Sequence, residues 1–250
     1  MGKQTEIWGY SERGVMNSFF YEISFSNNSL QILNGFLGQC FKPKRVFEME
    51  KAEIIIEQTF SGFGDSDAVI FAREAGKEMA FFIEAKVKTD SRKNYNIKKI
   101  MEFVRNGEVN ASNLFVQLLS KQKLCEYLPR YLSALSTAEK NGKKKVEESE
   151  GFKIVYKGNS SGEASKFVKL GSNTVVRRVA KKLGGIDEAF FISIVPACAE
   201  AVRQNFIQLL DDKTIRNWGF IEWPDVEDLC HKNHFFRTIN CFDQNKGQIY

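Results

Sequence analysis

Two short apolar runs, at positions 68–72 and 79–87, are separated by a polar stretch with one glycine, and this arrangement constrains the fold most strongly. Apolar runs of this length are typical of strands that are covered on both faces. The polar connection predicts a turn, so we expect the two runs to form an antiparallel hairpin. In such a pair, the start of the first strand lies beside the end of the second.

Charged residues stand at the two ends that this hairpin brings together. Asp67 precedes the first run, whereas Glu84 and Lys86 lie in the second and share one face because strand side chains alternate. We therefore expect Asp67 to lie next to Glu84. Two carboxylates at the end of a buried strand pair repel each other unless one is protonated or a cation lies between them. Magnesium or manganese, which prefer oxygen ligands, fit such a pair.

The roles of the neighbouring residues follow from the same pattern. An ammonium at Lys86 is placed to polarise an attacking water or a phosphate beside the metal. Asp65 follows a glycine and is typical of a turn residue. If the strand begins two residues earlier than expected, Asp65 shares a face with Asp67 and replaces it as the ligand. The sequence leaves these two alternatives open.

Ser66-Asp67 followed by Glu84-Ala85-Lys86 resembles the PD-(D/E)xK phosphodiesterase superfamily of restriction-endonuclease-like folds. The resemblance covers about positions 5–130, and Ser66 stands where the family has proline. It implies a helix–three-strand–helix core. It also implies nuclease activity that depends on Asp67, Glu84 and Lys86, with Asp67 and Glu84 as metal ligands.

The resemblance further implies a supporting glutamate on the first helix. Ser11 is a good helix cap, and an apolar stripe at helical spacing follows it up to position 23. Glu12, in the first turn of this predicted helix, is the expected supporting metal ligand. Glu22, on the same helix, is the alternative.

Polar residues of the helix after the lysine strand also often reach the site in the resembled family. The pattern predicts such a helix at about 111–127, and Gln117 on it is a possible supporting residue. We expect Lys121 and Gln122, on the same helix, to lie on a solvated face.

The remaining elements predict an α/β fold with a restriction-endonuclease-like core, in which helices flank a central mixed sheet of four or more strands. We expect a single nuclease-like domain over 1–250, with a charged loop at about 138–151 and a C-terminal strand-helix-strand extension at about 152–250. The other expected helices cover 29–39, 96–104 and 197–210, with a last one from position 224. The other expected strands cover 53–60, 190–195 and 218–223.

Charge and composition indicate the partner and the compartment. The net charge is +5, and basic residues follow the signature closely, so Lys88, Arg92 and Lys93 are expected to bind nucleic-acid phosphates. The basic stretch 177–182 is expected to be a solvated helix face. With no apolar run of membrane-spanning length and no signal-peptide pattern, we expect a cytoplasmic protein without a membrane partner.

The cysteines argue against both disulfides and zinc. Five cysteines, widely spaced and without a CxxC motif, do not indicate a disulfide framework. Cys230, His231, His234 and Cys241 cluster near the C-terminus, but their spacing matches no known zinc module.

The sequence therefore predicts a nuclease dependent on magnesium or manganese that hydrolyses phosphodiester bonds, with DNA as the expected substrate. A homodimer would suit paired cuts on two strands. The alternative is a non-catalytic nucleic-acid-binding or scaffold protein that retains the fold. A third interpretation assigns the same acids to a structural salt-bridge network.

Overall fold

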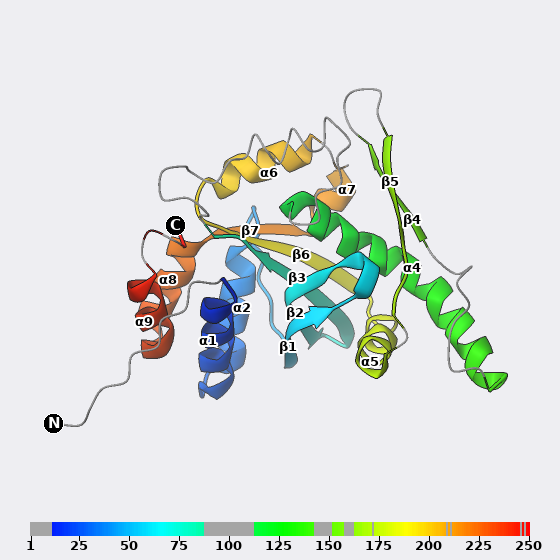
Figure 1. The fold of residues 1–250 in the computed structure, drawn as a ribbon. Helices are drawn as coiled ribbons and strands as arrows, with labels where there is room; N and C mark the ends of the chain where they lie inside the picture. The colour runs from blue at the N-terminus through cyan, green and yellow to red at the C-terminus, as the bar shows by residue number, and fades with distance from the viewer. Residues whose placement is uncertain are drawn as a thin grey trace.

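The computed structural model describes residues 12–87, 113–142, 152–157, 163–171, 173–208, 210, 212–245, 247 and 249–250. Its centre is a five-stranded mixed sheet with the order β1-β2-β3-β6-β7. The strands are β1 (Lys51–Thr59), β2 (Asp65–Glu74), β3 (Lys77–Ala85), β6 (Glu188–Val195) and β7 (Trp218–Glu222). The α/β class and the mixed sheet flanked by helices are thus confirmed (Figure 1).

The predicted hairpin forms β2 and β3, which pair antiparallel from Ala68 opposite Ile83 to Glu74 opposite Lys77. The two residues of its turn, Ala75 and Gly76, both have positive φ, at 47° and 78°. A two-residue turn with this backbone matches the right-handed twist of the flanking strands. β1 pairs antiparallel with β2, and β6 pairs parallel with β3 on the other side.

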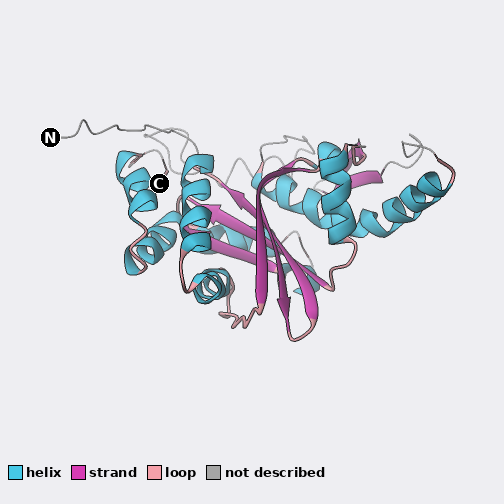
Figure 2. Ribbon diagram, turned by 90° about the horizontal axis from the view of Figure 1, so that it is seen from below, coloured by secondary structure: helices cyan, strands magenta, loops and turns pink. Residues whose placement is uncertain are grey.

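Helices cover both faces of the sheet, as Figure 2 shows from below. One face packs against α1 (Glu12–Phe25), α2 (Ser29–Gln39), α8 (Trp223–Lys232) and α9 (Phe236–Gln244). The other packs against α4 (Leu114–Lys140), α5 (Thr174–Leu183), α6 (Ala199–Ile207) and the two-stranded ribbon of β4 (Phe152–Lys157) and β5 (Glu163–Val168). A 3-10 turn, η1 (Ser61–Phe63), precedes β2, and the short helix α7 (Asp212–Ile215) precedes β7.

Successive side chains of the hairpin point to opposite faces of the sheet, and this decides which helices they contact. Ala68 and Ile83 belong to the core beneath α1 and α2, whereas Val69 and Phe82 belong to the core beneath α4. Asp67 and Glu84 therefore project toward α4, on the face opposite α1.

The helix after the lysine strand is longer than the pattern predicted. The Asn113 side chain caps it by accepting hydrogen bonds from the backbone N–H groups of Phe115 and Val116. It then continues through Pro129 to Lys140, beyond the expected end at 127 and into the range of the expected charged loop. The apolar stripe that packs on the sheet continues past the proline with Tyr131 and Leu135, and this packing explains the extra length.

The C-terminal extension joins the main sheet rather than forming a separate layer, because β6 lies beside β3 and β7 lies beside β6. Both pairs are parallel. The expected helix at 96–104 and the ends of the charged loop beyond position 142 lie outside the described residues. No described helix has the length and apolar character needed to cross a membrane.

Candidate functional site

Asp67 and Glu84 meet at the open end of the β2–β3 hairpin, as the sequence pattern predicted. The register that sets Ala68 opposite Ile83 places Asp67 beside Glu84 at the next position. The backbone N–H of Ala85 donates a hydrogen bond of 2.7 Å to Asp67 Oδ2, which fixes the Asp67 carboxylate against the end of β3. The two acids are 9% and 1% exposed.

Lys121 of α4 completes this cluster, which corrects the expectation that it lies on a solvated helix face. Its side chain is fully buried, and its Nζ lies 3.3 Å from Glu84 Oε1. The same ammonium donates a hydrogen bond of 3.1 Å to the carbonyl of Phe63 in η1. Lys121 thus connects α4, the β2–β3 hairpin and the turn that leads into β2.

The signal that identifies Lys121 is its place in the apolar stripe of its helix. Leu118, Lys121, Leu124 and Leu128 follow one another at intervals of three or four residues, and all four are buried. A lysine in such a stripe must be paired when buried. The acid that pairs with it comes from a strand 37 positions earlier, so only the tertiary structure reveals the partner.

The electrostatics of the pair show that burial dominates. Burial raises the pKa of Glu84 from its ordinary 4.5 to about 7, with Lys121 opposing the shift and Asp67 adding to it. Burial also lowers the pKa of Lys121 below its ordinary value, although Glu84, Asp65 and Asp67 oppose this shift. Both shifts favour the neutral forms, so desolvation outweighs the mutual attraction.

Apart from the Lys121 ammonium at 3.3 Å, Glu84 Oε1 has no hydrogen-bond partner among the described residues. Ser193, directly opposite Glu84 on β6, has a buried hydroxyl without a hydrogen-bond partner among these residues. Gln117 stands one turn before Lys121 on α4, and its side-chain oxygen is buried without a hydrogen-bond partner as well. Unsatisfied buried polar atoms of this kind require an explanation, such as an ion or a water.

Asp65 begins β2, so the strand has the earlier start that the sequence left open. It lies opposite Thr59 of β1 and is exposed. Period-two alternation places it on the side of Asp67, and its charge raises the pKa of Lys121. Asp67, however, is the acid that lies beside Glu84. The cluster meets solvent at the Asp65 end.

Lys86 follows β3 immediately and is half-buried. Its backbone is held on both sides: its N–H donates to the Ile194 carbonyl at 2.8 Å, and its carbonyl accepts from Trp223 Nε1 at 2.8 Å. The Lys86 charge lowers the pKa of Glu84, although less than Lys121 does. Two lysines therefore act on one carboxylate.

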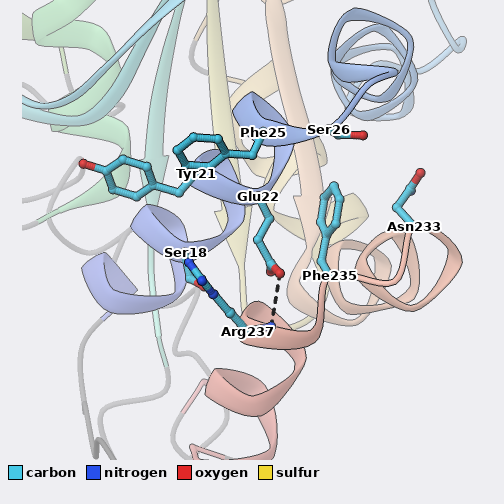
Figure 3. A pocket seen from close by; sticks show the side chains of 8 residues that line it. All are labelled: Ser18, Tyr21, Glu22, Phe25, Ser26, Asn233, Phe235 and Arg237. Atoms are coloured by element: carbon cyan, nitrogen blue, oxygen red, sulfur yellow. Dashed lines mark hydrogen bonds between the residues drawn. The ribbon is translucent and has the colours of Figure 1, made fainter.

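Glu22 does not belong to this cluster. Its carboxylate accepts hydrogen bonds from the backbone N–H groups of Arg237 and Thr238, at 3.1 and 2.8 Å, and so caps the N-terminus of α9. Figure 3 shows the bond to Arg237. It lines a hollow of about 850 Å³ between α1 and α9, on the sheet face opposite Asp67 and Glu84. The alternative of Glu22 as the supporting acid is thus disfavoured by its position.

Glu12 is the first residue of α1, and its side chain lies outside the described residues. The first turns of α1 are joined to β1 at Glu57, which lies at the same position along the sheet as Asp67. Arg13 forms an ion pair of 3.8 Å with Glu57, and Asn17 donates a hydrogen bond of 3.1 Å to the same carboxylate. Glu57 stands between Ile56 and Gln58 in β1, across from Asp67.

The remaining sequence candidates are basic residues. Lys88, Arg92 and Lys93 lie outside the described residues. In the basic helix α5, Lys181 and Lys182 are exposed and form ion pairs with Glu139 and Glu53. Within the described segments, no three or more His, Cys, Asp or Glu side chains are grouped so as to hold a metal ion.

The residues present fit a divalent cation in part. Two adjacent carboxylates and an oxygen of Glu84 without a further hydrogen-bond partner among the described residues are the donor chemistry that magnesium or manganese prefers. Against this, the Lys121 ammonium already contacts Glu84, and the described part of the chain supplies two clustered acids rather than three. A further ligand would come from water, a phosphate, a neutral oxygen such as that of Gln117, or a residue outside the described segments.

Comparisons with models of protein families, with curated proteins and with solved structures found no match to this chain.

Proposed function

We propose that this protein is a metal-dependent nuclease of the PD-(D/E)xK type that hydrolyses phosphodiester bonds, most plausibly in DNA. One observation carries the proposal: Asp67 and Glu84 lie side by side at the end of a buried hairpin, with Lys86 just beyond Glu84. The cost of burying two adjacent acids is explained most simply by a cation that binds between them.

Each residue of the cluster has a role in this proposal. Asp67 and Glu84 would hold magnesium or manganese, which would supply Lewis-acid activation of a water and charge neutralisation at the phosphate. The Ala85 N–H keeps the Asp67 carboxylate in a fixed orientation. Lys86 orients the attacking water, and the exposed Asp65 marks the side from which the phosphodiester approaches. Glu12 remains the proposed supporting acid, and Gln117 the proposed supporting amide.

The buried Lys121 favours a second candidate function. Its ammonium already balances the Glu84 charge, so the cluster is partly neutralised without any metal. On this view the protein binds nucleic acid without cleaving it, and the Glu84–Lys121 pair only sets how α4 is oriented on the hairpin. The two candidates differ in whether a divalent cation binds.

The test combines cleavage with metal binding. Circular, linear and single-stranded DNA are incubated with the protein in magnesium, manganese or EDTA, and thermal unfolding is recorded in the same buffers. The variants are Lys86→Ala and Glu84→Gln, with Lys77→Ala as the matched control because Lys77 is exposed at the opposite end of β3.

The nuclease proposal expects metal-dependent cleavage that both site variants lose and the control keeps. It also expects magnesium to raise the unfolding temperature of the wild type by mass action, with a smaller rise in Glu84→Gln. DNA binding without cleavage, and without a metal-dependent change in unfolding temperature, would support the second candidate instead.

A further inference from the structure

The outer face of the β4–β5 ribbon carries exposed basic and aromatic side chains next to the candidate site. Lys153 of β4 lies directly opposite Phe167 of β5, so the two side chains share one face. Lys153 is exposed, Phe167 is 63% exposed, and Lys169, just after β5, is exposed as well. The alternating residues Ile154 and Val168 are buried in the core beneath α4.

The base of this ribbon is fixed to the turn that leads into the candidate site. The N–H of Gly62 in η1 donates to the Lys169 carbonyl at 3.2 Å, and the N–H of Gly171 donates to Ser61 Oγ at 2.9 Å. Lys121 donates to the carbonyl of Phe63 in the same turn. The ribbon and the Glu84–Lys121 pair are therefore attached to the same three-residue element. Figure 1 shows the ribbon beside α4.

The positive charge of the ribbon favours a polyanion as its ligand. Positions 152–170 contain four lysines and one glutamate. What distinguishes Phe167 from other exposed phenylalanines is its place beside exposed lysines, because unpaired bases stack on such a ring while lysines bind the flanking phosphates. A base held in a duplex is already stacked and cannot use the ring in this way.

We infer that the outer face of the β4–β5 ribbon, formed by Lys153, Phe167 and Lys169, binds a nucleic-acid strand that contains unpaired bases. Phe167 stacks on a base, and the lysines bind the phosphates on either side. The inference rests on the proposed function only in taking nucleic acid as the ligand. It does not require cleavage.

Fluorescence anisotropy of a labelled single-stranded oligonucleotide and of its duplex tests this inference, with the full-length protein in EDTA to prevent metal-dependent cutting. The variant is the double substitution Lys153→Glu with Phe167→Ala. The matched control is Lys232→Glu with Phe236→Ala, which changes an exposed lysine and a 68% exposed phenylalanine on α8 and α9. Thermal unfolding checks that both remain folded.

We expect the ribbon variant to bind the single strand about 10-fold or more weakly, and the control to bind within about twofold of the wild type. Phe167→Ala alone should weaken single-strand binding more than duplex binding. Lys153→Ala alone should reduce the dependence of the single-strand affinity on salt concentration. Equal weakening by the ribbon variant and the control, no effect of the ribbon variant, or no binding of nucleic acid by the wild type would overturn the inference. If the wild type binds single strands through the ribbon but cuts no DNA when metal is present, only the proposed nuclease activity is refuted.

Discussion

Replacing Lys121 with methionine is the substitution that most directly tests the geometry of the buried cluster. The change removes the ammonium that lies 3.3 Å from Glu84 Oε1 and leaves an apolar side chain of similar length in a fully buried position. It also removes the hydrogen bond to the Phe63 carbonyl. Glu84 then has no cation from α4, and it can avoid a buried charge only by keeping a proton.

The expected loss of stability depends on pH. Leaving the Phe63 carbonyl unsatisfied costs about 1–3 kcal/mol at any pH. Lys121 lowers the pKa of Glu84, which is about 7 in the wild type, so removing Lys121 raises this pKa above the wild-type value. Above pH 7 the wild-type Glu84 ionises while the variant must keep its proton, which adds about 1.4 kcal/mol to the loss for each pH unit. At about pH 8.5 the additional loss is therefore about 2 kcal/mol by the same relation.

Urea denaturation of the metal-free protein at about pH 6, 7 and 8.5 measures this difference, provided that unfolding is two-state. The control is the same substitution in a Glu84→Gln background, where the Glu84 carboxyl does not titrate; any change of the loss with pH there comes from the lowered pKa of Lys121 and is subtracted. A loss in the Lys121→Met variant that is the same at all three pH values would refute the reasoning, because it would mean that Lys121 does not govern the ionisation of Glu84.

Two further predictions follow from the same contacts. In the metal-free wild type, Glu84 keeps its proton up to about pH 7 when folded but releases it near pH 4.5 when unfolded, so its contribution to stability is complete below pH 4.5 and is lost as pH rises to about 7. Urea midpoints across that range should show this fall, and Glu84→Gln should remove that component of it. Glu22→Ala removes the cap of α9 and should lower the free energy of unfolding by about 0.5–2 kcal/mol. Cleavage assays on folded Glu22→Ala should match the wild type, and a loss of cutting would restore Glu22 as a candidate for the site.

Local sequence patterns predicted the elements that carry the acids. The two apolar runs and the turn between them specify the hairpin, and the hairpin register alone brings Asp67 beside Glu84. The helix over 29–39 has the predicted bounds, and the late apolar strands add to the central sheet as expected. These features depend on residues close in sequence, where periodicity and turn chemistry decide the outcome.

Other features of the site were not predictable in this way. The start of β2 at Asp65 depends on pairing with Thr59 of β1. The Glu22 carboxylate caps a helix that begins more than 200 positions later in the chain. Lys121 occupies an apolar stripe, yet a lysine on a helix is ordinarily solvated, so its burial follows only from the acid that faces it.

The sequence by itself determined the hairpin, the adjacency of its two acids and the class of the fold, because strand periodicity and a short turn leave few alternatives. Only the tertiary structure decided which face of the hairpin α4 covers, and hence that Lys121 rather than solvent meets Glu84. The physical reason is that desolvation and ion pairing depend on what packs above a side chain, and that neighbour comes from a distant part of the chain.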